Sequence, residues 1–583
     1  MLILAGAVLG AVALSRVTGP VVAGLASSGT SVTISIVATT DLHGAVLPRG
    51  ERGGLALLAG YLSNLRAARQ RDGGGVLLVD SGDMFQGTLE SNLNEGAVVV
   101  QAYNSLGYAA AAIGNHEFDY GPPGPAATAG ASTDDPRGAL KARASEARFP
   151  FLTANVIDES TGRPVAWPNV HPSALVTVAG VKIGVVGVTT TTTPVTTIAE
   201  NLGGLRFGPL APAIEHEASA LRAGGASAVV VVAHAGGRCT TFDTPTDVSS
   251  CDQMSEIMDV VRALPPGLVN VVASGHTHQG MAHVVNGVAV VEAFSGGRAF
   301  SRVDLTISRT GRPLVSTHIF PPRDLCARED PAAHTCDPAA PVGGMVTADY
   351  EGRPVAPDEG IAALMAPAVR AARTVKEEPL GVVLDTELPH VPMAESALGN
   401  LLADEILAAA PGADISVVNG GAIRTSLPAG PLTFGQLYEL YPFDNRLVTL
   451  QLTGEQLSRI VAFNLERRDP PLEILSTAGI TIAAACGPRG LQVTLRRPDG
   501  SVVGANDAVV LVTNDFVASG GDGVLSPLGR IGPAQNLAGS PLLRDAVADG
   551  LRRRGGHLNE SQLRVPGRPR WSYPGSRPVS CGR

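Results

Sequence analysis

Residues 114–119 read GNHEFD and directly follow the apolar run AAAAI. Four other short polar motifs also follow apolar, largely β-branched runs. In chain order these motifs are Asp41-Leu42-His43, Gly82-Asp83, Ala233-His234 and Gly275-His276-Thr277-His278. Short apolar runs predict buried strands, and groups at the carboxyl ends of parallel strands meet at one edge of a sheet. The sequence therefore predicts a rim of Asp, Asn and His side chains, which is how a site for two metal ions is built.

The composition limits the class of protein. The chain has 583 residues, of which 44% are hydrophobic and 17% are charged, so we expect more than one domain with its own core. The net charge of −9 argues against a nucleic-acid polymer as partner, because proteins that bind such polymers carry basic surfaces.

The N-terminus and the cysteines both favour export. Residues 2–14 (LILAGAVLGAVAL) form a short apolar run followed by small residues. We therefore expect residues 1–30 to be a signal peptide or an N-terminal anchor, and the protein to be periplasmic, at the cell surface or extracellular. None of the six cysteines lies in a CxxC motif. Short loops close most easily, which favours the disulfides Cys239–Cys251 and Cys326–Cys336 and leaves Cys486–Cys581; six free thiols are the alternative.

Alternating strand and helix patterns predict two α/β domains. We place the first at residues 31–350, a linker helix at 351–378, a smaller second domain at 379–565 and a basic tail rich in Pro and Arg at 566–583. The basic segment from Arg552 onward is expected to be solvated. Predicted helices cover residues 55–70, 211–223, 254–263, 357–377, 395–410, 433–440 and 454–465. Predicted strands include residues 415–418 and 508–513 and an antiparallel pair within 298–319.

The polar motifs supply the ligands that two divalent ions need. Asp83 is the natural bridging carboxylate, and Asn115 offers an amide oxygen. The full set of candidate ligands is Asp41, His43, Asp83, Asn115, His234, His276 and His278. Because the set holds no thiolate, it suits Zn²⁺, Mn²⁺, Co²⁺ or Fe²⁺ over Cu(I). Each motif alone is common, whereas five motifs that hold five of the 12 His are a specific signal.

On these motifs the chain resembles the calcineurin-like metallophosphoesterases over residues 36–292. The order DLHG, GDMFQGT, GNHEFDYG, AHAGG and GHTH is similar to the 5′-nucleotidase branch of that family. The resemblance implies a four-layer αββα sandwich, in which helices flank two β-sheets. It also implies that one ion takes Asp41, His43, Asp83 and His278, and that the other takes Asp83, Asn115, His234 and His276.

The resemblance also implies two catalytic residues. His116 follows Asn115 and is expected to face the substrate instead of the ions. As an imidazolium, it would stabilise the transition state or protonate the leaving oxygen. Asp119, three residues further on, is expected to orient His116.

Three stretches of the second domain resemble the substrate domain of secreted 5′-nucleotidases. They are NGGAIR at 419–424, PFDNR at 442–446 and TNDFVASGGDG at 513–523. The residues implied to hold a nucleotide are Phe443 and Phe516 around the base, Asn419 at the base, Asp522 at the ribose and Arg424 at the phosphate. Glycines in two of the stretches allow tight turns, which suits a binding loop; core packing of the two phenylalanines is the alternative.

One departure from the family pattern concerns the phosphate. Where relatives often carry further arginines, this chain has Pro392, and His390 is a weak substitute. Phosphate binding is then expected to depend on Arg424 and the ions, without tight selection of monophosphates over cyclic or sugar-linked nucleotides.

The predicted function is that of a secreted, metal-dependent nucleotide phosphohydrolase, a phosphoric ester hydrolase with 5′-nucleotidase activity. Within the family, the alternatives are a 2′,3′-cyclic nucleotide phosphodiesterase with 3′-nucleotidase activity and a UDP-sugar hydrolase. A thiosulfohydrolase that acts on a carrier protein would have no use for a base-stacking pair. A non-catalytic surface module is disfavoured by the intact ligand set.

Overall fold

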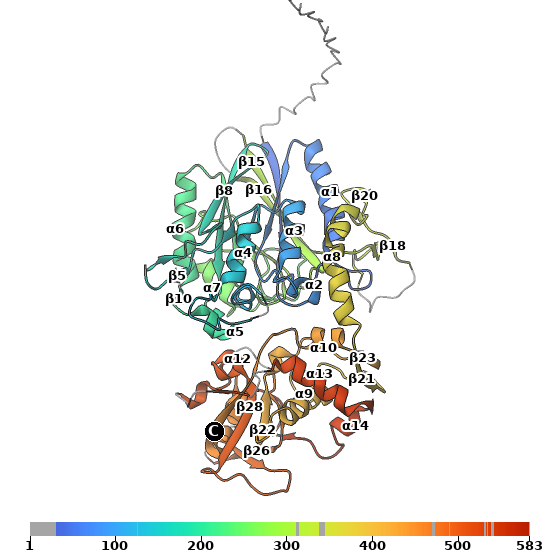
Figure 1. The fold of residues 1–583 in the computed structure, drawn as a ribbon. Helices are drawn as coiled ribbons and strands as arrows, with labels where there is room; N and C mark the ends of the chain where they lie inside the picture. The colour runs from blue at the N-terminus through green and yellow to red at the C-terminus, as the bar shows by residue number, and fades with distance from the viewer. Residues whose placement is uncertain are drawn as a thin grey trace, which may run out of the picture.

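A computed structural model describes residues 31–581 apart from residues 125, 310–313, 337–343, 469–472, 489, 530–531, 533 and 538–540. The apolar run at residues 2–14 therefore lies outside the described residues. Two α/β parts lie one below the other and are joined by helix α8 (Glu359–Lys376) (Figure 1). Among the helices described, none has the length and apolar character needed to cross a bilayer.

Two β-sheets pack face to face in the first part. In sheet order, the strands described for the first sheet are β16 (Leu314–Asp324), β15 (Ala299–Ser308), β1 (Ser31–Thr39), β2 (Gly75–Asp80), β3 (Ala110–Ala112), β4 (Phe151–Leu152) and β7 (Val170–His171). Those of the second are β13 (Gly280–Val285), β14 (Val288–Ala293), β12 (Val271–Ser274), β11 (Ala228–His234), β9 (Val181–Thr189) and β8 (Ser173–Val178). Ile36 and Val79 of the first sheet share one buried core with Val185 and Val230 of the second. Strands covered on both faces read as continuous apolar runs, as in VVVV at 229–232.

Helices cover the outer face of each sheet, from α6 on one side to α1 on the other (Figure 1). The helices of this part are α1 (Leu55–Arg71), α2 (Leu89–Asn92), α3 (Ala97–Leu106), α4 (Gly138–Glu146), α5 (Thr193–Thr196), α6 (Leu210–Ala223) and α7 (Glu256–Ala263). Successive residues of a strand point to opposite faces. Ile36 therefore enters the core between the sheets, whereas Val37 packs beneath the helices with Leu58 of α1. The predicted four-layer sandwich is confirmed.

Parallel pairing brings the strand ends to a common edge. Thr39 of β1 lies opposite Asp80 of β2, which lies opposite Ala111 of β3. In the second sheet Ala233 of β11 lies opposite Ser274 of β12. The segments that follow these residues carry the five polar motifs, so the registers of the two sheets deliver all five to one rim.

Short elements line the margins of this part. They are β5 (Val156–Asp158), β6 (Arg163–Pro164), β10 (Leu205–Phe207), β17 (Arg328–Glu329), β18 (Val346–Thr347), β19 (Asp349–Tyr350) and β20 (Arg353–Pro354).

The second part is built on smaller sheets. Its largest sheet has the order β25 (Ser476–Ala478), β22 (Ile415–Val418), β28 (Ala508–Asn514), β24 (Leu447–Thr453) and β29 (Gln535–Asn536). A second sheet has the order β23 (Gly430–Thr433), β21 (Pro379–Leu384) and β30 (Gly556–Leu558). A third sheet has the order β27 (Gly490–Arg496), β26 (Thr481–Gly487) and β31 (Trp571–Ser572). Its helices are α9 (Ala397–Ala408), α10 (Phe434–Leu440), α11 (Gly454–Glu466), α12 (Asp515–Ala518), α13 (Leu543–Arg554) and α14 (Glu560–Leu563). Val418 packs with α9 and α13, and Val417 packs with α11 on the opposite face.

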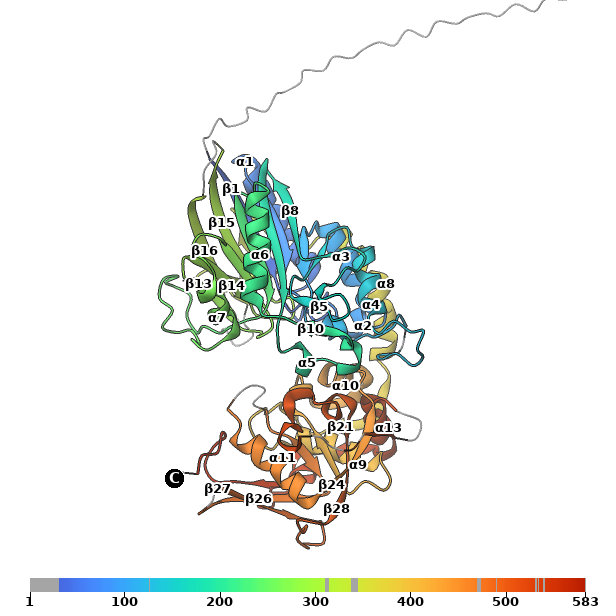
Figure 2. The same ribbon diagram turned by 90° about the vertical axis from the view of Figure 1, so that its left-hand side faces the viewer.

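The two parts contact each other beside the rim. Lys376, near the end of α8, pairs with Glu90 of α2 at 2.8 Å. Gln86 donates from Nε2 to the carbonyl oxygen of Pro442 at 2.7 Å. Helix α5 lies at the boundary between the parts (Figure 2) and touches the turn Gly521–Gly523 of the second part. These contacts hold the second part over the rim of the first.

Predicted and observed helices differ by at most two residues at their ends, whereas strand β16 runs to Asp324, five residues beyond the predicted antiparallel pair. Strand β22 spans the predicted residues, whereas α9 begins at Ala397 instead of residue 395. The cause is the N-cap: Ser396 has an extended backbone, and its hydroxyl accepts a hydrogen bond from Gly399 N at 3.0 Å.

The structure confirms the predicted disulfides but not the predicted solvated tail. All six cysteines are paired, as Cys239–Cys251, Cys326–Cys336 and Cys486–Cys581, which confirms the predicted pairing. The expectation of a solvated basic tail is wrong. Strand β31 pairs with β26, and Trp571 and Val579 are each only 5% exposed. Two isolated apolar residues within a basic stretch gave no periodic signal, so composition misled the prediction.

We expect the Cys486–Cys581 bond to secure this segment. It closes 95 residues, and in the loop-entropy model such a crosslink stabilises the folded state by about 4–5 kcal/mol. The double substitution Cys486→Ser/Cys581→Ser should lower the unfolding temperature and make the bond between Arg570 and Trp571 sensitive to trypsin. The control Cys239→Ser/Cys251→Ser should leave that bond protected. Equal cleavage rates in wild type and the first variant would contradict the assignment.

Candidate active site

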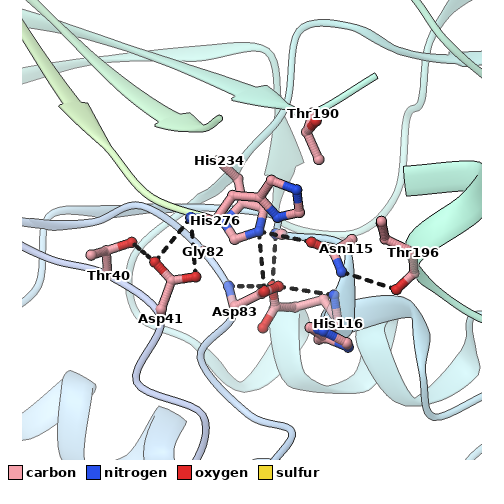
Figure 3. A network of polar contacts seen from close by, with 12 residues as sticks. Thr40, Asp41, Gly82, Asp83, Asn115, His116, Thr190, Thr196, His234 and His276 are labelled. Atoms are coloured by element: carbon pink, nitrogen blue, oxygen red, sulfur yellow. Dashed lines mark hydrogen bonds and ion pairs between the residues drawn. The ribbon is translucent and has the colours of Figure 1, made fainter. Parts of the chain in front are cut away.

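The predicted ligands lie in two clusters at the rim, and Figure 3 shows five of them, Asp41, Asp83, Asn115, His234 and His276. One cluster is Asp41, His43 and His278, and the other is Asp83, His234 and His276; within each, the potential ligand atoms lie within 4.8 Å of one another. Asp83 lies between the clusters, because its Oδ2 is 3.1 Å from His234 Nε2 and 3.9 Å from His43 Nε2. Asn115 Oδ1 lies 2.9 Å from His234 Nε2. The structure thus brings all seven candidate ligands together, with Asp83 in the position of a bridge.

Five of these residues have a left-handed backbone. Their φ angles are 48° for Asp41, 49° for His43, 56° for Asp83, 80° for His276 and 59° for His278. Residues with a Cβ seldom adopt such angles, which persist where the surrounding structure enforces them and which concentrate at functional sites.

Backbone hydrogen bonds between two loops enforce this geometry. Asp41 N donates to Gly82 O at 3.0 Å, and His43 N donates to Asp83 O at 2.9 Å. On the opposite side, His276 N donates to the Asp41 carboxylate at 3.0 Å. The backbone conformation of each loop is therefore fixed by hydrogen bonds to the neighbouring loop as well as by its own sequence.

The imidazole rings are oriented by backbone carbonyls. His43 Nδ1 donates to Gln86 O at 2.8 Å, and His234 Nδ1 donates to Ser81 O at 2.9 Å. A proton on Nδ1 leaves Nε2 with a lone pair, which is the arrangement found in histidines that bind metals. His43 Nε2 lies 2.9 Å from His278 Nε2, so ring nitrogens and carboxylate oxygens converge on shared points. This donor set fits divalent ions.

Two buried carboxylates that sequence analysis missed brace the rim. Glu117 accepts hydrogen bonds from the backbone nitrogens of Asp83, Met84 and Gly114 at 2.9, 2.7 and 2.7 Å. Burial, and then the charge of Asp83, raise the pKa of Glu117 to about 8. Glu292 accepts from Thr277 Oγ1 at 2.6 Å. The only sequence feature that pointed to Glu117 was its place inside the motif GNHEFD. No sequence feature pointed to Glu292.

His116 and Asp119 form a pair at the edge of the rim. His116 Nδ1 lies 2.6 Å from Asp119 Oδ2, and the backbone nitrogen of His116 donates to Asp83 Oδ1 at 2.9 Å. Thr197, a further residue absent from the sequence prediction, donates to Asp119 Oδ1 at 2.5 Å. Burial lowers the pKa of His116, but Asp119 and Asp83 outweigh it, so that the pKa lies above its usual value. Asp119 and Asp83 therefore stabilise the charged form of the imidazole.

A cavity of about 690 Å³ lies between the two parts of the chain. Eleven of the fourteen predicted site residues line it, whereas Asp41, His43 and His234 are not among its lining residues. Phe443 comes from the second part, and its ring lies 5.8 Å from that of His116 and 5.5 Å from the Arg424 guanidinium. Residues over 300 positions apart thus face one another across a single cavity.

Asn419 has partners other than those predicted. Its Nδ2 donates to Asp522 Oδ2 at 2.6 Å, and its Oδ1 accepts from Asn514 Nδ2 at 3.0 Å. These contacts position Asp522, and the contact of Asn419 with a base stays a prediction. Asn445 also lines the cavity and is buried; the motif PFDNR contained it, but nothing in the sequence singled it out.

Both parts of the chain match family models. Residues 34–280 match the calcineurin-like phosphoesterases, and residues 372–527 match the 5′-nucleotidase C-terminal domain. Together with the rim, the fold defines an enzyme that hydrolyses phosphate esters. More narrowly, the chain belongs to the family of hydrolases that join a calcineurin-like phosphoesterase domain to a 5′-nucleotidase C-terminal domain.

Named relatives extend over most of the chain. UshA of Yersinia enterocolitica is 26% identical over 514 residues, which cover 84% of this chain and 86% of UshA. Endonuclease YhcR of Bacillus subtilis is 26% identical over 519 residues, which cover 86% of this chain but only 38% of YhcR. A 5′-nucleotidase precursor from Thermus thermophilus has a TM-score of 0.67 at 23% identity, covering 90% of this chain and 97% of its own. This structural likeness confirms the two-part fold.

The rim predicts different outcomes for two substitutions. Asp83→Ala should abolish hydrolysis and lower the metal content, because Asp83 lies between both clusters. His116→Ala should keep the metal content near that of wild type and lower turnover about 10²- to 10⁴-fold, the usual contribution of a positioned acid or base. Metal analysis of purified protein and the rate of p-nitrophenyl phosphate hydrolysis measure the two effects. Equal loss of metal in both variants would show that His116 is a ligand.

Proposed function

We propose that the protein is an exported, metal-dependent nucleotide phosphohydrolase that releases phosphate from nucleoside 5′-monophosphates. The observation that carries this proposal is one cavity that reaches both candidate ligand clusters, one through His278 and the other through Asp83 and His276, and that is also lined by Phe443, Phe516 and Asp522. The alternatives within the same family are a 2′,3′-cyclic nucleotide phosphodiesterase with 3′-nucleotidase activity and a UDP-sugar hydrolase.

Divalent metal ions belong to this proposal, since the calcineurin-like phosphoesterases use them. One ion would be held by Asp41, His43, Asp83 and His278, and the other by Asp83, Asn115, His234 and His276. Bound there, such ions lower the pKa of water and offset the negative charge that develops on the phosphoryl oxygens. The mixed oxygen and nitrogen donors suit Zn²⁺, Mn²⁺, Co²⁺ or Fe²⁺.

The chain's own residues supply the remaining charge and the proton. Asp119 holds the proton on His116 Nδ1, which leaves Nε2 to donate to the phosphoryl or the leaving oxygen. Within the described residues Arg424 forms no ion pair, and it lines the cavity, so its guanidinium is available to a phosphate.

Two aromatic rings and a carboxylate would hold the nucleoside. An ideal Cβ on Gly521 would lie 2.5 Å from three atoms of the Phe516 ring, so glycine is required for the ring to lie against this loop. Phe443 is braced edge-on by Tyr441 at 5.8 Å. Stacking of a base on such rings stabilises the complex by about 1–3 kcal/mol per base. Asp522, fixed by Asn419, is suited to accept hydrogen bonds from ribose hydroxyls.

Export is supported by the three disulfides, because such bonds persist in oxidising compartments. The apolar run at residues 2–14 is proposed to direct it, as a cleaved signal or as an anchor at the membrane or cell surface.

A panel of substrates tests the proposal. Hydrolysis products would be measured for AMP (phosphate and adenosine), UDP-glucose (UMP and glucose 1-phosphate), 2′,3′-cyclic AMP (3′-AMP) and bis(p-nitrophenyl) phosphate (p-nitrophenol), with added Mn²⁺ or Zn²⁺ and after chelation. We expect AMP hydrolysis that is lost on chelation and restored by metal. No hydrolysis of any nucleotide under these conditions would overturn the proposal.

The base-stacking role makes a separate prediction. Phe443→Ala and Phe516→Ala should each raise the KM for AMP, by about fivefold to more than a hundredfold if 1–3 kcal/mol of stacking is lost. Hydrolysis of p-nitrophenyl phosphate, which has no base, should change little. If these residues were core aromatics, both activities and the melting temperature would fall together.

A further inference from the structure

Gln86 lies at the junction of the two parts of the chain and had no role in the sequence prediction. It belongs to the motif GDMFQGT, three residues after Asp83, and it lines the cavity. The residue is only 3% exposed. A hydrogen bond made in such a place is shielded from water and is stronger than one at the surface.

The backbone of Gln86 is tied to the metal rim. Its carbonyl oxygen accepts the hydrogen bond from His43 Nδ1 at 2.8 Å. An ideal Cβ on Gly87 would lie 2.4 Å from His43 O, so glycine is required for the two segments to lie this close. The main chain at Gln86 is therefore fixed relative to a predicted metal ligand.

The side chain of Gln86 is tied to the second part of the chain. Its Nε2 donates to Pro442 O at 2.7 Å, and Asn92 Nδ2 makes a longer contact with the same oxygen at 3.4 Å. A carbonyl oxygen can only accept, so the nitrogen of the Gln86 amide must face it. Pro442 directly precedes Phe443, so this contact acts on the segment that carries a proposed stacking ring.

The other contacts of Phe443 lie largely within the second part. Arg544 donates to Phe443 O at 3.2 Å and pairs with Asp444, and Tyr441 packs edge-on against the Phe443 ring. Phe516, the second proposed stacking ring, belongs to the same part. The second part can therefore assemble the base site by itself, whereas the position of that site relative to the rim depends on contacts between the parts.

The amide of Gln86 is poorly suited to a purely structural role. Its Oε1 is buried and has no hydrogen-bond partner among the described residues, which costs stability. A leucine of similar size would fill the same space without that cost. Residues that break such a rule are expected at functional sites. The contact with Pro442, and not packing, accounts for a glutamine at this position.

We propose that Gln86 is a positioning residue that fixes the base site at a set distance from the metal rim, so that one nucleotide can reach both. The inference rests on the proposed function, because it assumes that the base lies against Phe443 while the phosphate is hydrolysed at the rim. A substrate held at both ends has less freedom to lose on the way to the transition state. Loss of the contact should therefore affect substrates that span both sites.

The test compares AMP with two molecules that each occupy one site. p-Nitrophenyl phosphate reaches the rim without a base, and adenosine offers a base without a phosphate. In Gln86→Leu the kcat/KM for AMP, relative to that for p-nitrophenyl phosphate, should fall about tenfold, as expected for the loss of one buried hydrogen bond. The affinity for adenosine, measured by calorimetry, should stay near that of wild type, because both rings remain.

Two further measurements separate positioning from a structural role. The melting temperature of Gln86→Leu should stay near that of wild type, because the substitution also removes the unpaired Oε1. Gln86→Glu keeps the length of the side chain but turns a carboxylate oxygen toward Pro442 O, so it should lower the AMP ratio at least as far. Metal content establishes that each variant is loaded.

Gln101→Leu is the matched control. Gln101 is exposed on α3 and is not among the cavity-lining residues, so its substitution should leave the ratio unchanged. An unchanged ratio in both Gln86 variants would overturn the inference alone. It would also be overturned if adenosine affinity, both activities and the melting temperature fell together. A wild-type protein that does not hydrolyse AMP would instead overturn the proposed function.

Discussion

The hydrogen bonds between the Asp41–His43 loop and the Gly82–Asp83 loop are the constraint on which the site depends. They hold non-glycine residues in left-handed conformations that neither loop would keep alone. The parallel register of β1 and β2 brings the two loops side by side, and Glu117 ties the second of them to the GNHEFD segment. Ligand geometry is therefore set by the pairing of the sheet, and the close-packed core between the sheets fixes that pairing.

Much of the fold and the rim could be predicted because their signals are local. Apolar runs such as VVVV at 229–232 indicate strands buried on both faces, and a polar motif directly after each run lies at the strand end. Helix ends were harder, because the start of α9 depends on the hydroxyl of Ser396 and not on hydrophobic periodicity. Trp571 and Val579 were missed for a related reason: Trp571 depends on the distant strand β26, and Val579 N donates to Leu465 O of the distant helix α11.

The cavity wall was predicted less completely, since its chemistry arises from contacts between distant residues. Asn419 is in the cavity as expected, but its amide is engaged by Asp522 and Asn514, about a hundred residues away in the chain. Thr197 completes the His116–Asp119 pair from a segment with no recognisable motif. The type of a residue suggests what its side chain could bind, but its hydrogen-bond partners in the folded chain determine its role.

The separate cores of the two parts have a consequence for how this enzyme could change. Val37 and Leu58 stabilise the rim from one core, and Val417 and Val418 stabilise the cavity wall from others. Substitutions that reshape the wall therefore leave the packing beneath the rim intact. The residues of the rim and those of the opposite side of the cavity therefore belong to separately packed parts of the chain. Replacing the part that follows α8 by another domain would change which substrates fit the cavity while the rim stays the same.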